Sequence, residues 1–152
     1  MTGLQLYFVE VPDDWTDHYG HMNEGYYVVA ASNSFWAFQS HLGIGTDYYD
    51  ETGFAMVTVE THVRYLDEVH RGDELRITNT IHGHDAKRAI FGVQMHVGER
   101  LCATMEAMCL HIDHKNGGLG PLPESVQQAF ADLTPDPLPD WAGRSVGFQK
   151  KG

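Results

Sequence analysis

The 152-residue chain is long enough for one domain with a full core, and its 42% hydrophobic share is ordinary for a folded protein. Its formal net charge of −11, with histidine neutral, argues against nucleic acid and against an anionic membrane as partners. We expect no secretory leader and no membrane segment. Cys102 and Cys109 have odd spacing in one predicted strand, so they should not bridge each other, and a cytoplasmic location is favoured.

The first predicted elements are a strand over residues 4–11 and a loop over residues 12–23. The apolar run from Gly25 to Leu42 then covers most of a helical wheel. Asn23 is suited to cap the start of this helix, and Gly43 is suited to end it. A helix that is apolar nearly all round is typical of a buried helix.

After a short capped turn, the hydrophobic period changes from that of a helix to two. In residues 57–65 the odd positions are mostly apolar and the even positions are polar, which predicts an antiparallel strand with one buried face. Three more strands are predicted, over residues 74–82, 88–97 and 100–113. A short amphipathic helix follows at residues 124–133.

This order of elements predicts an α+β domain in which a curved antiparallel sheet of five or six strands wraps one long central helix. That arrangement is the hotdog fold. We expect the domain to span residues 1–134 and a Pro/Gly-rich C-terminal arm to span residues 135–152. The edge strands of such a sheet usually pair with another protomer, so a homo-oligomer, either a dimer or a dimer of dimers, is expected.

The segment from Asp17 to Asn23 resembles the D-x-x-G-H-x-N signature of hotdog acyl-CoA thioesterases of the 4-hydroxybenzoyl-CoA type. More narrowly, residues 15–24, 59–66 and 85–88 are similar to the betainyl-CoA thioesterase module linked to carnitine dehydrogenase. The resemblance extends from about Val11 to Val126. It implies hydrolysis of a small acyl-CoA, such as betainyl-CoA, to free acid and CoA without a cofactor. The alternatives are another short or aromatic acyl-CoA substrate, or a module that binds acyl-CoA without turnover.

The resemblance also implies roles for individual residues. Asp17 would attack the thioester carbonyl or activate water, and the sequence leaves both open. Backbone N–H groups from Gly20 to Asn23 would stabilise the oxyanion, although Gly20 also suits a turn with positive φ and Asn23 a simple helix cap. His21 would orient Asp17 or the carbonyl, or bond the neighbouring loop. Glu60 is either a second acid facing the partner's helix start or part of a solvated sheet face.

Aromatic faces can hold the quaternary ammonium of a betainyl group. We expect one or two of the residues Trp15, Tyr26 and Trp36 to line the acyl pocket, although aromatic residues of this kind more often belong to a core. Thr61 is expected to supply a hydroxyl beside them.

Basic residues are few, and those on the predicted turns of the sheet form one cluster: Arg64, Arg71, Lys87 and Arg88. Lys87 and Arg88 are the predicted site for the CoA phosphates, with Arg64 nearby. A solvated hairpin explains the pair about as well.

Histidines are frequent, and two strands carry pairs of them with an aspartate: His82 and His84 with Asp85, and His111 and His114 with Asp113. Neither spacing matches a zinc motif well, so no metal site is expected.

Overall fold

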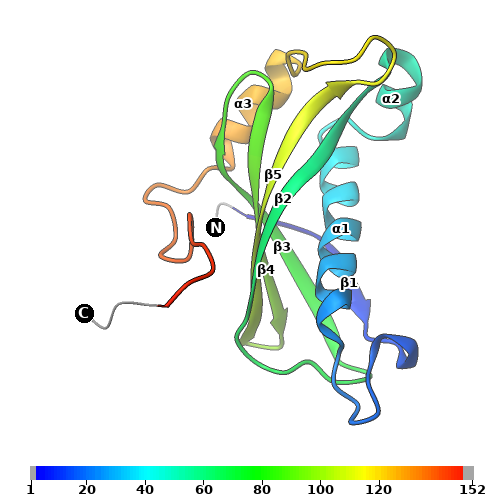
Figure 1. The fold of residues 1–152 in the computed structure, drawn as a ribbon, viewed down its shortest axis with the longest axis vertical. Helices are drawn as coiled ribbons and strands as arrows, with labels where there is room; N and C mark the ends of the chain where they lie inside the picture. Colours follow the sequence, from blue (N-terminus) through cyan, green and yellow to red (C-terminus); the bar gives the residue numbers. More distant parts are fainter. Residues whose placement is uncertain (1–2, 149–152) are drawn as a thin grey trace.

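The computed structural model describes residues 3–148 and contains a five-stranded antiparallel sheet with one long helix against one face (Figure 1). The elements in chain order are β1 (Leu4–Glu10), a 3-10 turn (Asp13–Trp15), α1 (Glu24–His41), α2 (Thr46–Thr52), β2 (Phe54–Tyr65), β3 (Glu74–His84), β4 (Arg88–Val97), β5 (Arg100–Asp113) and α3 (Glu124–Asp132). The strand order is β1-β3-β4-β5-β2, and every neighbouring pair is antiparallel. The predicted α+β order and sheet are confirmed.

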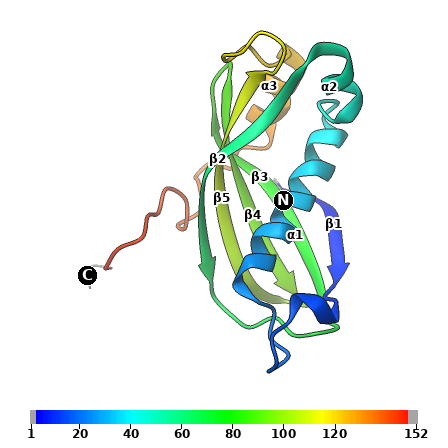
Figure 2. The ribbon, with the colours of Figure 1, turned by 45° about the vertical axis from the view of Figure 1, so that its right-hand side comes forward.

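Helix α1 buries one side against the sheet and leaves the other side exposed. The buried side consists of Tyr27, Ala30, Ala31, Ser34, Phe35, Phe38 and Gln39. On the outer side, Val28 is 37% exposed, Val29 41% and Trp36 52%. The prediction that α1 is buried all round is therefore wrong for the single chain, because one sheet covers only one side of a helix (Figure 2). The apolar outer side lacks a covering surface among the described residues.

The C-terminal arm lies on the face of the sheet opposite α1 (Figure 1). Glu106 of β5 holds it there, because one carboxylate oxygen accepts a bond of 2.6 Å from the Gly143 N–H. The other oxygen lies 2.7 Å from Nδ1 of the buried His82, and the Trp141 ring packs 4.5 Å from the His82 ring, centroid to centroid. Trp141 is thus held on the body of the domain. Residues 149–152 of the predicted arm lie outside the described residues.

Both cysteines are buried and free. Burial raises the pKa of the Cys109 thiol to about 11, and it also raises the pKa of Cys102. Neither thiol is a nucleophile at neutral pH, because the thiolate is the reactive form. Over residues 3–148, no helix combines the length and the apolar composition that crossing a bilayer requires.

His111 of β5 fixes the far end of the sheet. Its Nδ1 lies 2.8 Å from the Gly120 carbonyl oxygen and therefore carries the proton, while Nε2 accepts a bond of 3.0 Å from the Tyr48 hydroxyl. The ring also stacks on Phe54 at 4.6 Å. Burial lowers the pKa of His111, and the bond to Gly120 opposes this effect only in part. The folded protein therefore prefers the neutral ring.

We expect His111 to make folding stability depend on pH. Its pKa is lower in the folded chain than the ordinary value of 6.5, so the unfolded chain binds more protons between the two values. The contribution is present above the ordinary value and is lost as pH falls through the folded-state pKa. His111→Gln removes it, so urea midpoints of wild type and variant should converge between about pH 7 and pH 5.

The exposed His114 provides the matched control, and His114→Gln should follow the wild-type pH dependence. Parallel pH profiles for wild type and His111→Gln would contradict the assignment.

Candidate active site

The loop before α1 folds into a tight turn around Asp17. The Asp17 N–H donates to the His21 carbonyl at 2.9 Å, and the Gly20 N–H donates to the Asp17 carbonyl at 3.0 Å. Oδ1 of Asp17 accepts from the backbone N–H groups of Tyr19 at 2.9 Å and His21 at 3.1 Å. Gly20 has φ of 80°, a conformation that favours glycine, so its predicted turn role is confirmed.

The Asp17 carboxylate is ionised at neutral pH. Partial desolvation would raise its pKa, but the N–H groups of His21 and Tyr19 and the nearby imidazoles outweigh this and hold it below the usual 3.8. No described residue bonds its second oxygen, Oδ2. An ionised carboxylate with one oxygen free can attack a carbonyl carbon or take a proton from water.

The turn is docked on the loop between β2 and β3. The Met22 N–H donates to the Val69 carbonyl at 2.7 Å, and the Arg71 N–H donates to the Gly20 carbonyl at 3.0 Å. His21 and His70 form an isolated antiparallel bridge. Met22 and Val69 are both buried. These bonds fix the start of α1 beside the end of β2.

The first turn of α1 determines which amides are available. The Asn23 side chain accepts from the Gly25 N–H at 3.0 Å, which confirms its role as N-cap. The N–H groups of residues 20–23 all have partners. In chain order they donate to the Asp17 carbonyl, the Asp17 carboxylate, the Val69 carbonyl and the Trp15 carbonyl. Their predicted role as oxyanion donors is therefore wrong for this structure. No described group accepts from the N–H of Glu24, the next residue.

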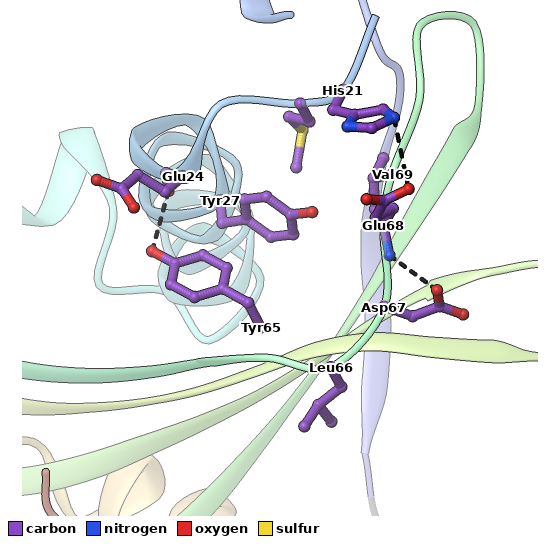
Figure 3. A pocket seen from close by; sticks show the side chains of 9 residues that line it. His21, Glu24, Tyr27, Tyr65, Leu66, Asp67, Glu68 and Val69 are labelled. Atoms are coloured by element: carbon purple, nitrogen blue, oxygen red, sulfur yellow. Dashed lines mark hydrogen bonds and ion pairs between the residues drawn. The ribbon is translucent and has the colours of Figure 1, made fainter. Parts of the chain in front are cut away.

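A cleft of about 540 Å³ lies between the start of α1 and the β2–β3 loop (Figure 3). Three acids line it, Glu24, Asp67 and Glu68. So do Tyr27 and Tyr65, whose rings pack edge to face with centroids 5.0 Å apart. Burial raises the pKa of both phenols, so they stay neutral. An acidic cleft with aromatic walls suits an organic cation.

Two of the predicted pocket aromatics come together, and the third lies elsewhere. Trp15 and Tyr26 stack with centroids 5.3 Å apart, beside the turn but outside the walls of the cleft. Trp36 lies about 15 Å from Tyr26 along α1. It lines a separate cleft of about 570 Å³. The sequence pattern did not distinguish Tyr27 from Tyr26. It also gave no reason to select Tyr65, which ends a strand.

Glu60 and Thr61 do not reach this cleft within one chain. Glu60 faces away from α1, because the next residue on its face, His62, pairs with Glu106, which holds the arm. Thr61 has the opposite orientation. About 17 Å of strand separates Glu60 from Tyr65 at the cleft. The predicted approach of Glu60 to the helix start of a partner involves a second chain, so it stays a prediction.

The predicted basic cluster does not form. Arg64 and Arg88 pair with positions of β5 that lie about 20 Å apart along the strand. Arg88 donates to the Asp85 carboxylate from Nε at 2.7 Å, with a second nitrogen at 2.6 Å, and Arg71 pairs with an acid of the 3-10 turn. Lys87 makes no ion pair with a described residue. It is the free cation of this hairpin.

The histidine pairs weighed as metal ligands are separated by their contacts. His82 bonds Glu106, and His84 lies against a ring of α3. His111 is fully bonded, and His114 lies against a tyrosine of α2. Neither predicted pair forms a ligand set.

Comparisons with known proteins agree on the family. Residues 11–130 match the Thioesterase-like superfamily. The chain is 41% identical over 144 residues to an L-carnitine dehydrogenase/betainyl-CoA thioesterase of Ruegeria pomeroyi, covering 90% of this chain and 28% of that protein. It therefore spans less than a third of that relative. It is 27% identical over 155 residues to a betainyl-CoA thioesterase of Pseudomonas aeruginosa, covering 95% of each.

Among solved structures, a Staphylococcus aureus protein in complex with CoA superposes with a TM-score of 0.87 at 21% identity, covering 98% of each chain. At this identity the likeness concerns the fold alone. Together with the family match, it confirms the predicted hotdog fold.

Proposed function

The chain belongs to the Thioesterase-like superfamily, and from this membership we propose that it is a thioesterase that hydrolyses a small acyl-CoA to free acid and CoA. The observation that carries the proposal is the turn before α1. It holds an ionised Asp17 with one oxygen free, and its last residues, His21 and Met22, line the cleft at the start of the helix.

The proposed reaction uses these groups as follows. Oδ2 of Asp17 attacks the thioester carbon directly or removes a proton from the water that attacks it. The developing oxyanion is stabilised by the Glu24 N–H and the positive end of the α1 dipole. The C–S bond then breaks, and the CoA sulfur leaves and takes up a proton. On the direct route this leaves an acyl–Asp17 anhydride, which water then hydrolyses to the free acid, restoring the carboxylate. His21 lines the cleft and would orient the carbonyl.

Asp17→Asn should separate catalysis from structure. The Asn side-chain oxygen can still accept from the Tyr19 and His21 N–H groups, so the thermal midpoint should change little. Loss of the negative charge removes the nucleophile or base, so kcat should fall at least about 100-fold. The measurement is steady-state hydrolysis, with CoA release followed by a thiol reagent.

Glu24→Gln and Glu68→Gln test the other acids at the cleft. A fully active Asp17→Asn beside an inactive Glu24→Gln or Glu68→Gln would move the catalytic role to that acid. Retained acyl-CoA binding without turnover in wild type would instead indicate a binding module.

We further propose betainyl-CoA as the substrate. Betainyl-CoA thioesterase relatives at 27–41% identity support this choice, and so does the chemistry of the cleft. Its carboxylates, chiefly that of Glu24, would face the quaternary ammonium, and the rings of Tyr27 and Tyr65 would contact its methyl groups. Trp15 and Tyr26 would support the wall from behind.

Charge recognition predicts a substrate preference. The 3,3-dimethylbutanoyl thioester has the shape of the betainyl group without its charge, and its kcat/KM should be roughly tenfold lower. Glu24→Gln should reduce that ratio. Glu60→Gln should leave the ratio unchanged if residues of one chain alone bind the ammonium group. It should reduce the ratio if Glu60 enters a partner's site. Equal turnover of both esters would reject charge recognition and leave the thioesterase proposal standing.

We propose that the enzyme is a homodimer joined along β2. This strand is an edge of the sheet, and its central residues 58–61 are exposed. It lies beside the exposed apolar side of α1, since Trp36 shares a cleft with Met56 and Thr58 of β2. A second copy would bury both surfaces at once.

A twofold axis at β2 would also complete the CoA site. Antiparallel pairing places the start of one β2 beside the end of the other. Val57, near the start of β2, is level with Arg88 across the sheet, because both pair with Leu110. The corresponding Lys87–Arg88 hairpin of a second copy would thus approach the cleft. We propose Lys87, with Arg88, as the phosphate contact.

Dimerisation is tested on the two surfaces together. Trp36→Glu and Val59→Lys should each shift the molar mass in sedimentation equilibrium from two chains toward one, because each places a charge in an apolar contact. Leu138→Lys, at an exposed leucine of the arm on the face of the sheet opposite α1, is the control and should remain a dimer. A wild-type monomer at micromolar concentration would reject the proposal.

A further inference from the structure

Two loops that border the cleft bring two imidazoles and one carboxylate together. His21 precedes α1, while Glu68 and His70 lie between β2 and β3. Oε2 of Glu68 lies 3.4 Å from Nε2 of His21 and 3.6 Å from Nε2 of His70 (Figure 3 shows the first pair). One ligand atom from each residue lies within 4.8 Å of the other two. Within residues 3–148, no other three side chains of the ligand types meet this condition.

These distances resemble those around a four-coordinate metal ion. Zinc binds imidazole nitrogen and carboxylate oxygen at about 2.0–2.2 Å, so neighbouring ligand atoms of a tetrahedral site lie about 3.3–3.5 Å apart. Two of the three edges are already close to this length. The side chains of His21, Glu68 and His70 are 39%, 63% and 48% exposed, so small rotations can close the third edge without repacking the core.

The backbone beneath the cluster is fixed. His21 and His70 face each other across the isolated antiparallel bridge, so their side chains leave the backbone at adjacent points. The Met22 N–H bond to Val69 at 2.7 Å and the Arg71 N–H bond to Gly20 at 3.0 Å lie on either side of the bridge. A ligand set on two rigidly joined loops loses little entropy when an ion binds.

A second carboxylate lies beside one of the histidines. Oδ2 of Asp73 accepts from the His70 backbone N–H at 2.8 Å and lies 3.7 Å from Nδ1 of the His70 ring. A carboxylate beside Nδ1 favours the tautomer in which Nε2 is free to bind a metal. Such carboxylate–histidine pairs are regular neighbours of metal sites. An ordinary surface ion pair does not require a carboxylate beside the second ring nitrogen, so this contact favours a metal site.

We propose that His21, Glu68 and His70 bind one divalent transition-metal ion, with Zn²⁺ the best match to two nitrogen donors and one oxygen donor. Three protein ligands leave at least one position for water or for a ligand in the adjoining cleft. The bound ion joins the loop before α1 to the loop after β2.

The test uses the full chain freed of metal with a chelator and purified without a histidine tag. Titration with Zn²⁺ should give one ion per chain by calorimetry and raise the thermal midpoint. Co²⁺ should produce the intense visible absorption of a four-coordinate site, and Mg²⁺ should give no heat. No saturable Zn²⁺ binding, or octahedral Co²⁺ spectra alone, would overturn the proposal.

Variants assign the ligands. His70→Ala and Glu68→Gln should each weaken Zn²⁺ at least tenfold, and Asp73→Asn should weaken it about 10–100-fold while keeping the bond from the His70 N–H. His41→Ala, at the exposed end of α1, is the control and should bind as wild type does. Wild-type affinity in His70→Ala would place the ion elsewhere and reject the site. These readouts do not depend on turnover, so they stand apart from the thioesterase proposal.

Discussion

The docking of the turn before α1 on the loop after β2 is the constraint on which the rest of the site depends. The bonds that Met22 and Gly20 make with Val69 and Arg71 of that loop fix where α1 begins, and α1 in turn fixes the outer wall of the cleft. The same contact brings His21 and Glu68 together at the cleft, with their side chains 3.4 Å apart, and holds Asp17 in the turn that ends at His21. A catalytic group must be held within about 0.5 Å of its productive position. Backbone bonds between buried residues provide that precision better than exposed side chains do.

In the proposed mechanism, Asp17 has both a structural and a chemical role. One oxygen of Asp17 closes the turn, and its bonds to two backbone N–H groups lower the carboxyl pKa. The other oxygen is left for chemistry. The interaction that orders the loop is therefore also the one that keeps the carboxylate ionised. A serine or an alanine at this position could not do both.

Much of this arrangement could be predicted from the sequence, because it depends on residues that are close together in the chain. Alternation predicted the strands, Asn23 and Gly20 predicted a cap and a turn, and both were found. The contacts that fix the cleft were not readable, because they join distant segments. Glu68 and Tyr65 had no local signal. Alternation placed Glu60 on the polar face with His62, where it lies, but it could not reveal the bulge between Thr58 and Glu60 that shifts the register with β5.

The apolar outer side of α1 has a similar explanation. The sequence shows that both sides of the helix are apolar. It does not show whether the outer side is covered by another part of the same chain or by a second copy. A five-stranded sheet covers one side, and the remaining apolar area lies beside the unpaired edge of β2.

The substrate adds an electrostatic reason for a second copy. The cleft is acidic, and the phosphates of an acyl-CoA must lie away from it. Within one chain the free cation Lys87 lies at the far end of the sheet, about 20 Å or more from Tyr65. Antiparallel pairing of two copies at β2 would bring Lys87 of one chain close to the cleft of the other, because the far end of one sheet would meet the near end of the other. One interface would then cover the helix, complete the sheet and place positive charge where the nucleotide leaves an acidic pocket.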